Sequence, residues 1–193
     1  KVQFVIFTFS VGIPSENVKI TNCTFQSGFG VAVGSEMSGG VRNVLVRDCQ
    51  FENVYCAVNI KAPRGRGGVI ENVRYENIAH QNGSTEYKDC RWFRGAINID
   101  QFYSHETFDA EQPEAITDGT PVIRNILLKN ITTDTIAGNA IYLAGLPESP
   151  LKNLRLENIR AVGKHGMKIY NTSCCTLENV EVHPGKNENT DYS

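Results

Sequence analysis

The stretches Asn17–Phe25 (NVKITNCTF) and Asn43–Phe51 (NVLVRDCQF) share a phrase that recurs along the whole chain. Four further copies are Asn72–His80 (NVRYENIAH), Asn125–Thr133 (NILLKNITT), Asn153–Ala161 (NLRLENIRA) and the shorter Asn179–Val182 (NVEV). The opening residues at 17 and 179 are 162 positions apart, or six intervals of 27, if the gap between 72 and 125 holds two repeats. A fixed period of this size is typical of a solenoid built from stacked repeats.

The periodicity inside each phrase is that of a β-strand. Apolar residues alternate with polar ones, as at Val18 and Ile20 or at Leu154 and Leu156. Ankyrin and tetratricopeptide helices would instead place apolar residues at i, i+3 and i+4. A second short apolar segment follows most copies, such as Ala96–Ile99. The pattern predicts an all-β, right-handed parallel β-helix with roughly seven coils.

Equivalent positions of the copies should stack along the axis of such a helix. The position six residues after each opening Asn is apolar or Cys and predicts one inward ladder, made of Cys23, Cys49, Ile78, Ile131 and Ile159. Neighbours in this ladder would lie about 4.8 Å apart. The opening Asn residues predict a second ladder at a corner, where amides bond to one another and tolerate turn dihedrals. We therefore expect these Asn residues to be structural.

Composition narrows the possible functions. The 193 residues suit one domain, and the net charge of −2 gives no electrostatic reason to expect a nucleic-acid partner. Since no stretch reaches about 18 consecutive apolar residues, we expect no membrane span. The six cysteines lack zinc-type spacing, so we expect neither a metal nor a cofactor. A disulfide between Cys23 and Cys49 is geometrically conceivable, but buried free thiols are the default interpretation.

Three segments depart from the repeat. Residues 1–11 are strongly apolar and form an atypical N-terminal segment, which could cap the end of the solenoid. Residues 79–119 form a loop-rich insertion, and residues 184–193 form a polar tail. Aromatic residues gather around the insertion and either pack its loops or form a platform for sugar stacking; they are Tyr87, Trp92, Phe93, Phe102 and Tyr103.

Several motifs resemble glycoside hydrolase family 28, the polygalacturonase family of pectin-degrading β-helix enzymes. The resemblance is strongest over Gly12–Val44, which contains Gly34–Gly40 (GSEMSGG), and over Ile60–Ile78 (IKAPRGRGGVIENVRYENI). Thr120–Ile126 (TPVIRNI) and Ile141–Pro150 (IYLAGLPESP) resemble the C-terminal coils of the family. The resemblance covers roughly residues 12–183. It implies a polygalacturonase-like hydrolase, with an extracellular or periplasmic location, although we find no signal peptide in this chain.

The resemblance also implies a mechanism. Members carry Asn-Thr-Asp, Asp-Asp, Gly-His-Gly and Arg-Ile-Lys motifs on one face. The aspartates provide the acid and base of an inverting hydrolysis, and the cationic residues bind uronate carboxylates. A carboxylic acid is needed because one group must protonate the leaving oxygen while another activates water.

This chain departs from the family pattern at every motif. The two aspartate motifs would precede Gly12–Asn17, but residues 1–11 contain no Asp or Glu. Phe29 stands where the family His is expected, and Asn59 stands where the Arg of Arg-Ile-Lys is expected. Lys61 is retained. On this resemblance, we expect the chain to lack the N-terminal catalytic half of the family, and we identify no catalytic residue.

Two other carboxylates could take over the chemistry. Glu36 lies in the GSEMSGG turn, and Asp100 ends the segment Asn98–Asp100. An inverting pair needs carboxyl groups roughly 6.5–9.5 Å apart, and no partner for either can be placed from sequence. We therefore expect this chain to be catalytically incompetent by itself.

A basic cluster remains near the expected catalytic face. Lys61, Arg64 and Arg66 could bind the carboxylates of an acidic polysaccharide or oligosaccharide such as a pectin fragment. Alternatively, Arg64–Gly68 is a tight surface turn, and the chain is either a non-catalytic binding protein or a structural β-helix remnant. The coil at the N-terminal end would expose strand edges, so self-association is a further expectation.

Overall fold

The computed structural model describes residues 4–6, 12–83, 93–103 and 109–185, and it contains no helix in these ranges. All strand pairs are parallel and fall into two sheets. The six-stranded sheet A contains β1 (Phe4–Ile6), β5 (Val31–Val33), β7 (Val58–Lys61), β9 (Gly95–Asp100), β11 (Asn139–Ala144) and β13 (His165–Tyr170). The eight-stranded sheet B contains β2 (Ser15–Glu16), β3 (Lys19–Thr21), β4 (Thr24–Phe25), β6 (Val41–Glu52), β8 (Val69–Asn82), β10 (Val122–Thr135), β12 (Leu151–Gly163) and β14 (Thr172–Pro184).

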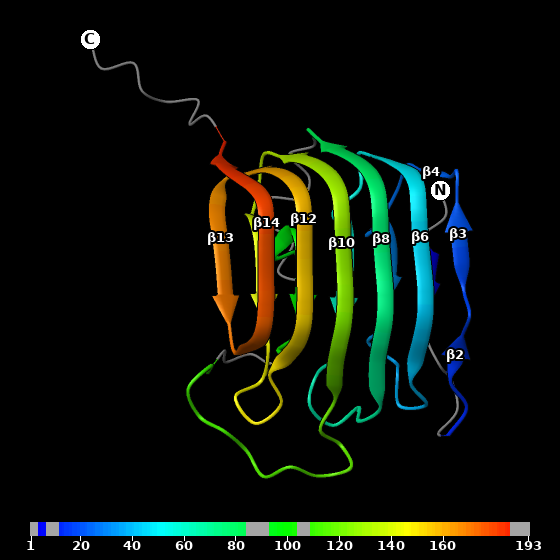
Figure 1. The fold of residues 1–193 in the computed structure, drawn as a ribbon, viewed down its shortest axis with the longest axis vertical. Coiled ribbons are helices and arrows are strands. Elements are labelled where there is room, and N and C mark those ends of the chain that lie inside the picture. The colour runs from blue at the N-terminus through cyan, green and yellow to red at the C-terminus, as the bar shows by residue number, and fades with distance from the viewer. Residues whose placement is uncertain (1–3, 7–11, 84–92, 104–108, 186–193) are drawn as a thin grey trace.

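The chain alternates between the two sheets, so the predicted parallel β-helix is confirmed. The interval from Asn72 to Asn125 holds one long coil and not the two repeats that the spacing suggested, because β8 pairs directly with β10. In Figure 1 the long strands of sheet B stand side by side from β6 to β14, with the strands of sheet A behind them. The connections that leave the carboxyl ends of the sheet A strands gather at the lower edge of this view. The longest of these, drawn in green, precedes β10.

The core consists of inward rows that run along the axis. Cys49, Ile78, Ile131 and Ile159 are register partners in β6, β8, β10 and β12, which confirms this part of the predicted inward ladder. Each of these side chains is at most 2% exposed. Stacking equivalent apolar residues at every coil removes their surfaces from water, and this burial holds the two sheets together.

The corner ladder is also present. The opening Asn residues have φ between 52° and 58°, in the left-handed region that Asn tolerates better than most residues. Their amides form a chain of hydrogen bonds: Asn43 donates to Asn17, Asn72 to Asn43, Asn125 to Asn72 and Asn153 to Asn125, over 3.0–3.2 Å. This geometry supports a structural role for these residues.

The register corrects the assignment of Asn179. Its amide donates to Asn158 over 3.1 Å, so Asn179 belongs to a second ladder that runs through Asp48, Asn77, Asn130 and Asn158. The position equivalent to Asn153 is occupied by Cys174, whose φ is also positive at 59°. The phrase misled the alignment because Asn occurs twice within it, five residues apart, and the final coil is shorter than its neighbours.

The three atypical segments are only partly described. In residues 1–11, the backbone of β1 pairs with β5 and extends sheet A, whereas a capping role and self-association remain predictions. Residues 79–119 include the end of β8 and all of β9. In the polar tail, residues 186–193 lie outside the described part of the chain. None of the described segments forms a helix able to cross a membrane.

Candidate functional site

The outer face of sheet A carries the candidate site, at the carboxyl ends of its strands. One row across this face consists of Lys61, Asp100, Ala144 and Tyr170, which are register partners in β7, β9, β11 and β13. Two residues earlier, the parallel row consists of Asn59, Asn98, Tyr142 and Lys168. The residues between these rows point inward, because side chains alternate along a strand.

Lys61 is the cation at the centre of this face. Its Nζ lies 4.3 Å from the ring centroid of Tyr103 and 5.7 Å from that of Phe29. Both distances are within the range of cation–π attraction. Among the residues that the structure describes, no carboxylate forms an ion pair with Lys61. The ammonium group is therefore held in place by aromatic rings while its charge remains available to an anion.

Phe29 and Asn59, which occupy the positions of two family motif residues, both belong to this face. The Phe29 ring stacks on Tyr55, with centroids 4.3 Å apart and planes inclined by 12°. Asn59 is buried, and its Oδ1 accepts a hydrogen bond of 3.0 Å from Nδ2 of Asn98. Neither side chain can supply the proton transfer or the positive charge that the family residues would provide.

Asn98, on the same face, has a side-chain oxygen without a hydrogen-bond donor among the described residues. Its side chain is 4% exposed, and its Oδ1 has no hydrogen-bond partner in the described part of the chain. A buried carbonyl oxygen without a donor costs about 1–3 kcal/mol, so such atoms are uncommon in folded proteins. A hydroxyl group that reached this atom would relieve the penalty.

Asp100 is a buried carboxyl beside Lys61 in the register. It is 2% exposed, and its Oδ1 accepts a hydrogen bond of 2.7 Å from the Phe102 amide. Burial raises the pKa of Asp100 to about 6, although the Phe102 amide and the charge of Arg94 oppose the shift. Asp100 can therefore hold a proton in mildly acidic solution. It is one carboxyl, whereas inverting hydrolysis needs two.

Glu36, the other carboxylate considered from sequence, has local partners. It accepts a hydrogen bond from the Ser35 hydroxyl at 3.2 Å and pairs with Arg66 at 3.1 Å. The side chains of Arg66 and Glu36 are 43% and 50% exposed. This contact is an exposed surface ion pair between two turns.

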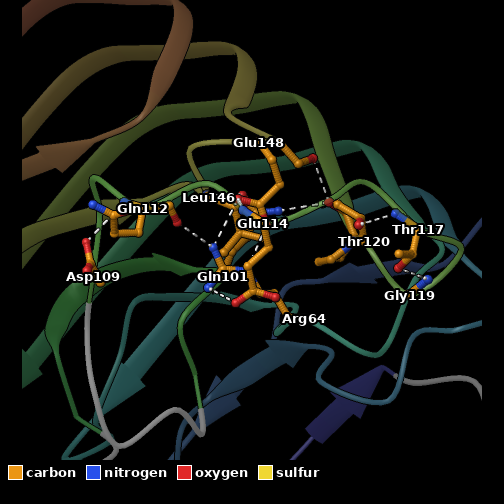
Figure 2. A network of polar contacts seen from close by, with 12 residues as sticks. Arg64, Gln101, Asp109, Gln112, Glu114, Thr117, Gly119, Thr120, Leu146 and Glu148 are labelled. Carbon is orange, nitrogen blue, oxygen red and sulfur yellow. Dashed lines mark hydrogen bonds and ion pairs between the residues drawn. The ribbon is translucent and has the colours of Figure 1, made fainter.

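Arg64 lies at the centre of the polar network in Figure 2. It forms a two-point contact with Glu148, in which Nε and Nη2 donate over 2.7 and 3.0 Å, and Nη1 pairs with Glu114 at 3.1 Å. The guanidinium also lies 5.5 Å from the Phe102 ring centroid. The Glu148 contact raises the pKa of Arg64 and lowers that of Glu148. The structure thus uses Arg64 to hold the chain around Glu114 and Glu148 against the coil.

The structure separates the aromatic residues that the sequence grouped together. Tyr103 contacts Lys61, and Phe102 lies beneath Arg64, whereas Phe93 packs near Tyr55 at 5.9 Å. Tyr87 and Trp92 lie outside the described residues. Sequence reasoning missed Asn98 and Tyr142, although their alternation with inward Ile97, Ile99, Ile141 and Leu143 indicated that they face outward.

No group of three or more His, Cys, Asp or Glu side chains that could hold a metal ion occurs within the described ranges. The residues of the candidate site offer a cation, aromatic rings, amide groups and one carboxyl. These groups suit recognition of a hydroxyl-rich anionic ligand better than metal binding.

Comparison with known proteins identifies the family of this chain. The family profile described as "Glycosyl hydrolases family 28" matches residues 8–184. Similar proteins include "Polygalacturonase-2" of Solanum lycopersicum, at 28% identity over 79% of this chain and 31% of that protein, and "Probable polygalacturonase" of Vitis vinifera, at 26% identity over 79% and 28%. A "Polygalacturonase" of Nicotiana tabacum is 40% identical over 39% of this chain and 20% of its own length. The chain spans about a third of the length of the first two relatives. With a parallel β-helix and a profile match over most of its length, the chain belongs to glycosyl hydrolase family 28.

Proposed function

We propose that this chain binds acidic pectin fragments on the outer face of sheet A and does not hydrolyse them by itself. The observation that carries the proposal is the Lys61 ammonium group, held between Tyr103 and Phe29 without a carboxylate partner in the described chain. A galacturonate residue offers the matching chemistry, since it combines a carboxylate with hydroxyl groups.

The neighbouring groups support this assignment. Aromatic rings provide apolar surfaces for a sugar ring, and the Oδ1 atom of Asn98 needs a hydrogen-bond donor. Membership of family 28 and the names of the similar proteins point to the same substrate class. Because pectin is a cell-wall polymer, an extracellular or periplasmic location is part of the proposal.

Arg64 and Arg66 contribute to the proposal in a different way from Lys61. Both are already paired with carboxylates, Arg64 with Glu148 and Glu114, and Arg66 with Glu36. We propose that both arginines provide positive electrostatic potential next to the site and hold the neighbouring loops in position. Lys61 is assigned the direct contact with a uronate carboxylate.

We expect no hydrolysis because inverting hydrolysis needs two carboxyl groups placed on the same face. Along the two outward rows of β7, β9, β11 and β13, Asp100 is the one carboxyl among the described residues. An acid or base group typically contributes 10²–10⁴-fold to the rate of such a reaction. We expect the isolated chain to release no measurable reducing ends from polygalacturonic acid.

Binding can be tested with a purified oligogalacturonate by isothermal titration calorimetry. The chain should bind this oligomer, and Lys61→Met should weaken binding roughly tenfold or more, the loss of one charge-assisted contact. Lys152→Met is the matched control, because Lys152 is an exposed lysine on β12 of sheet B, whereas the site lies on sheet A. Its affinity should remain that of the original chain.

Two further measurements separate the alternatives. A methyl-esterified oligomer lacks the carboxylates and should bind weakly to the original chain, and added salt should weaken binding of the acidic oligomer. Equal affinity of the two lysine variants would place the binding surface elsewhere. If no oligomer binds at millimolar concentration, the structural-remnant interpretation is correct.

A further inference from the structure

Two cysteines face each other across the first two coils of sheet B. The register pairs Thr21 with Arg47 and Thr24 with Gln50, so Cys23 lies opposite Cys49. The Gln50 amide donates to the carbonyl of Cys23 over 2.9 Å, which joins the two strands at this point. Neighbouring strands are about 4.8 Å apart, within the Cα separation of 4.4–6.8 Å that disulfides span.

The two thiols also have matching orientations. Cys23 donates to the carbonyl of Thr21 over 3.3 Å, and Cys49 donates to the equivalent carbonyl of Arg47 over 3.2 Å. Two residues further along, Phe25 stacks on Phe51 with centroids 5.0 Å apart, which shows that equivalent side chains lie above one another here. A change of rotamer at either cysteine, together with a small approach of the two strands from their spacing of about 4.8 Å, would bring the sulfur atoms within bonding distance.

We propose that Cys23 and Cys49 form an oxidative modification site that closes to an intrachain disulfide. A low-molecular-weight disulfide is the oxidant. The Cys23 thiolate attacks it and forms a mixed disulfide, and the first small thiol leaves. The Cys49 thiolate then attacks the sulfur of Cys23, forms the protein disulfide and releases the second small thiol. The two protein thiols are oxidised, the small disulfide is reduced, and the two protons leave with the small thiols.

The order of attack follows from exposure. Cys23 is half-buried, whereas Cys49 is 1% exposed. Burial also raises the pKa of Cys49, so its thiolate is scarce and the closing step is the slower one. Cys56 is no competitor for Cys23, because its thiol is buried and donates to the Gly95 carbonyl, in a different part of the coil.

The bond would reinforce the weakest part of sheet B. The strands that precede β6 and pair along its length are β2, β3 and β4, of two, three and two residues, whereas β8 and β10 have 14 residues each. A crosslink from Cys23, between β3 and β4, to Cys49 on β6 would close a loop of 26 residues and reduce the conformational freedom of the open state. Local opening of this coil should therefore become rarer.

The test uses the purified chain, treated with oxidised glutathione, alkylated under denaturing conditions, digested with trypsin and analysed by mass spectrometry. We expect a crosslink between the peptides Ile20–Arg42 and Asp48–Lys61. Because the second peptide also contains Cys56, the crosslink must persist in Cys56→Ser and disappear in Cys49→Ser. The backbone N–H of Asn22 donates to the Arg47 carbonyl. In the oxidised chain, the hydrogen of this N–H group should exchange with solvent roughly tenfold more slowly than in the reduced chain.

Each outcome decides the proposal. A crosslink that survives in Cys56→Ser supports it. Glutathione that remains attached to Cys23 without closure contradicts it, as do thiols that stay reduced or a crosslink of Cys23 to another cysteine. The analysis of the original chain and of Cys56→Ser suffices even if Cys49→Ser does not fold.

Discussion

Equivalent positions carry the same residue at the corner of sheet B, whereas they carry different residues at the carboxyl edge of sheet A. At the corner of sheet B, the same position is Asn in five successive coils, from Asn17 to Asn153. At the carboxyl edge of sheet A, one row reads Lys61, Asp100, Ala144 and Tyr170. Repetition on sheet B reflects a requirement that every coil shares, whereas variation on sheet A reflects groups that are needed only once. In this molecule, structural residues repeat and candidate site residues do not.

The largest effects that we expect are opposite pH dependences of stability, each caused by one buried residue on one of the two sheets. Burial lowers the pKa of His80, on β8 of sheet B, from 6.5 to about 4, although the nearby charge of Asp134 opposes the shift. The unfolded chain then binds the extra proton between these values, so His80 makes stability fall as pH decreases from 6.5 to 4. Asp100, on β9 of sheet A, has its pKa raised from 3.8 to about 6. In this case the folded chain holds the proton, so Asp100 makes stability fall as pH increases from 4 to 6.

Over its pH range, each residue changes the free energy of unfolding by about 3 kcal/mol, from roughly 1.4 kcal/mol per pKa unit. Urea unfolding at several pH values measures these changes. The stability of the original chain minus that of Asp100→Asn should decrease between pH 4 and 6, and the same difference for His80→Gln should increase between pH 4 and 6.5. Slopes of the same sign for the two variants would show that one environment is misassigned.

A second prediction tests the repeated position directly. Asn125→Val places a β-branched residue at φ 56° and removes the side-chain hydrogen bonds to Asn72 and Asn153. We expect a loss of about 2–3 kcal/mol in the free energy of unfolding, measured by urea denaturation. Asn125→Gly keeps the backbone conformation accessible and should cost about 1 kcal/mol. Equal losses would mean that the hydrogen bonds, not the positive φ, make Asn necessary.

A third prediction compares two arginines of the same turn. Arg64→Ala removes the partner of Glu148, whose side chain is only 4% exposed, and should cost about 2 kcal/mol. Arg66→Ala removes an exposed ion pair with Glu36 and should cost less than about 1 kcal/mol. Thermal unfolding of both variants measures this contrast. A larger loss for Arg66→Ala would reverse the assignment of Arg64 as the structural residue.

The smallest expected effect on stability belongs to the central residue of the candidate site. Lys61→Met removes only the cation–π contacts with Tyr103 and Phe29, worth about 0.5–1 kcal/mol. The variant should unfold within about 1 kcal/mol of the original chain while losing affinity for oligogalacturonate. A large loss of stability would assign Lys61 to the structural group of residues.

The repeated residues made most of the fold predictable. Alternating apolar residues and the ladder of Cys49, Ile78, Ile131 and Ile159 depend on strand periodicity, which is a local property of the sequence. The position of Asn179 was predicted wrongly, because two Asn residues per repeat offered two alignments. The register of β12 with β14 and the hydrogen bond to Asn158 distinguish them.

The candidate site was less predictable from sequence. Motif comparison identified Lys61, Phe29 and Asn59 as positions of interest, and the rings around Lys61 became apparent only when Tyr103, 42 residues later, was brought beside it. Sequence likewise grouped Arg64 with Lys61 as free cations. The contact between Arg64 and Glu148 joins residues 84 positions apart, and no local pattern reveals such a pair.

The sequence by itself determined the β-helix and the family, because each coil repeats the same local rules of alternation and turn formation. The length of the coil between Asn72 and Asn125, in contrast, became clear only from the pairing of β8 with β10. The tertiary structure decided which charges are paired, which carboxyl is buried and which rings surround Lys61. These properties depend on contacts between distant coils, where a residue's solvation and partners are set by neighbours that its own segment does not specify.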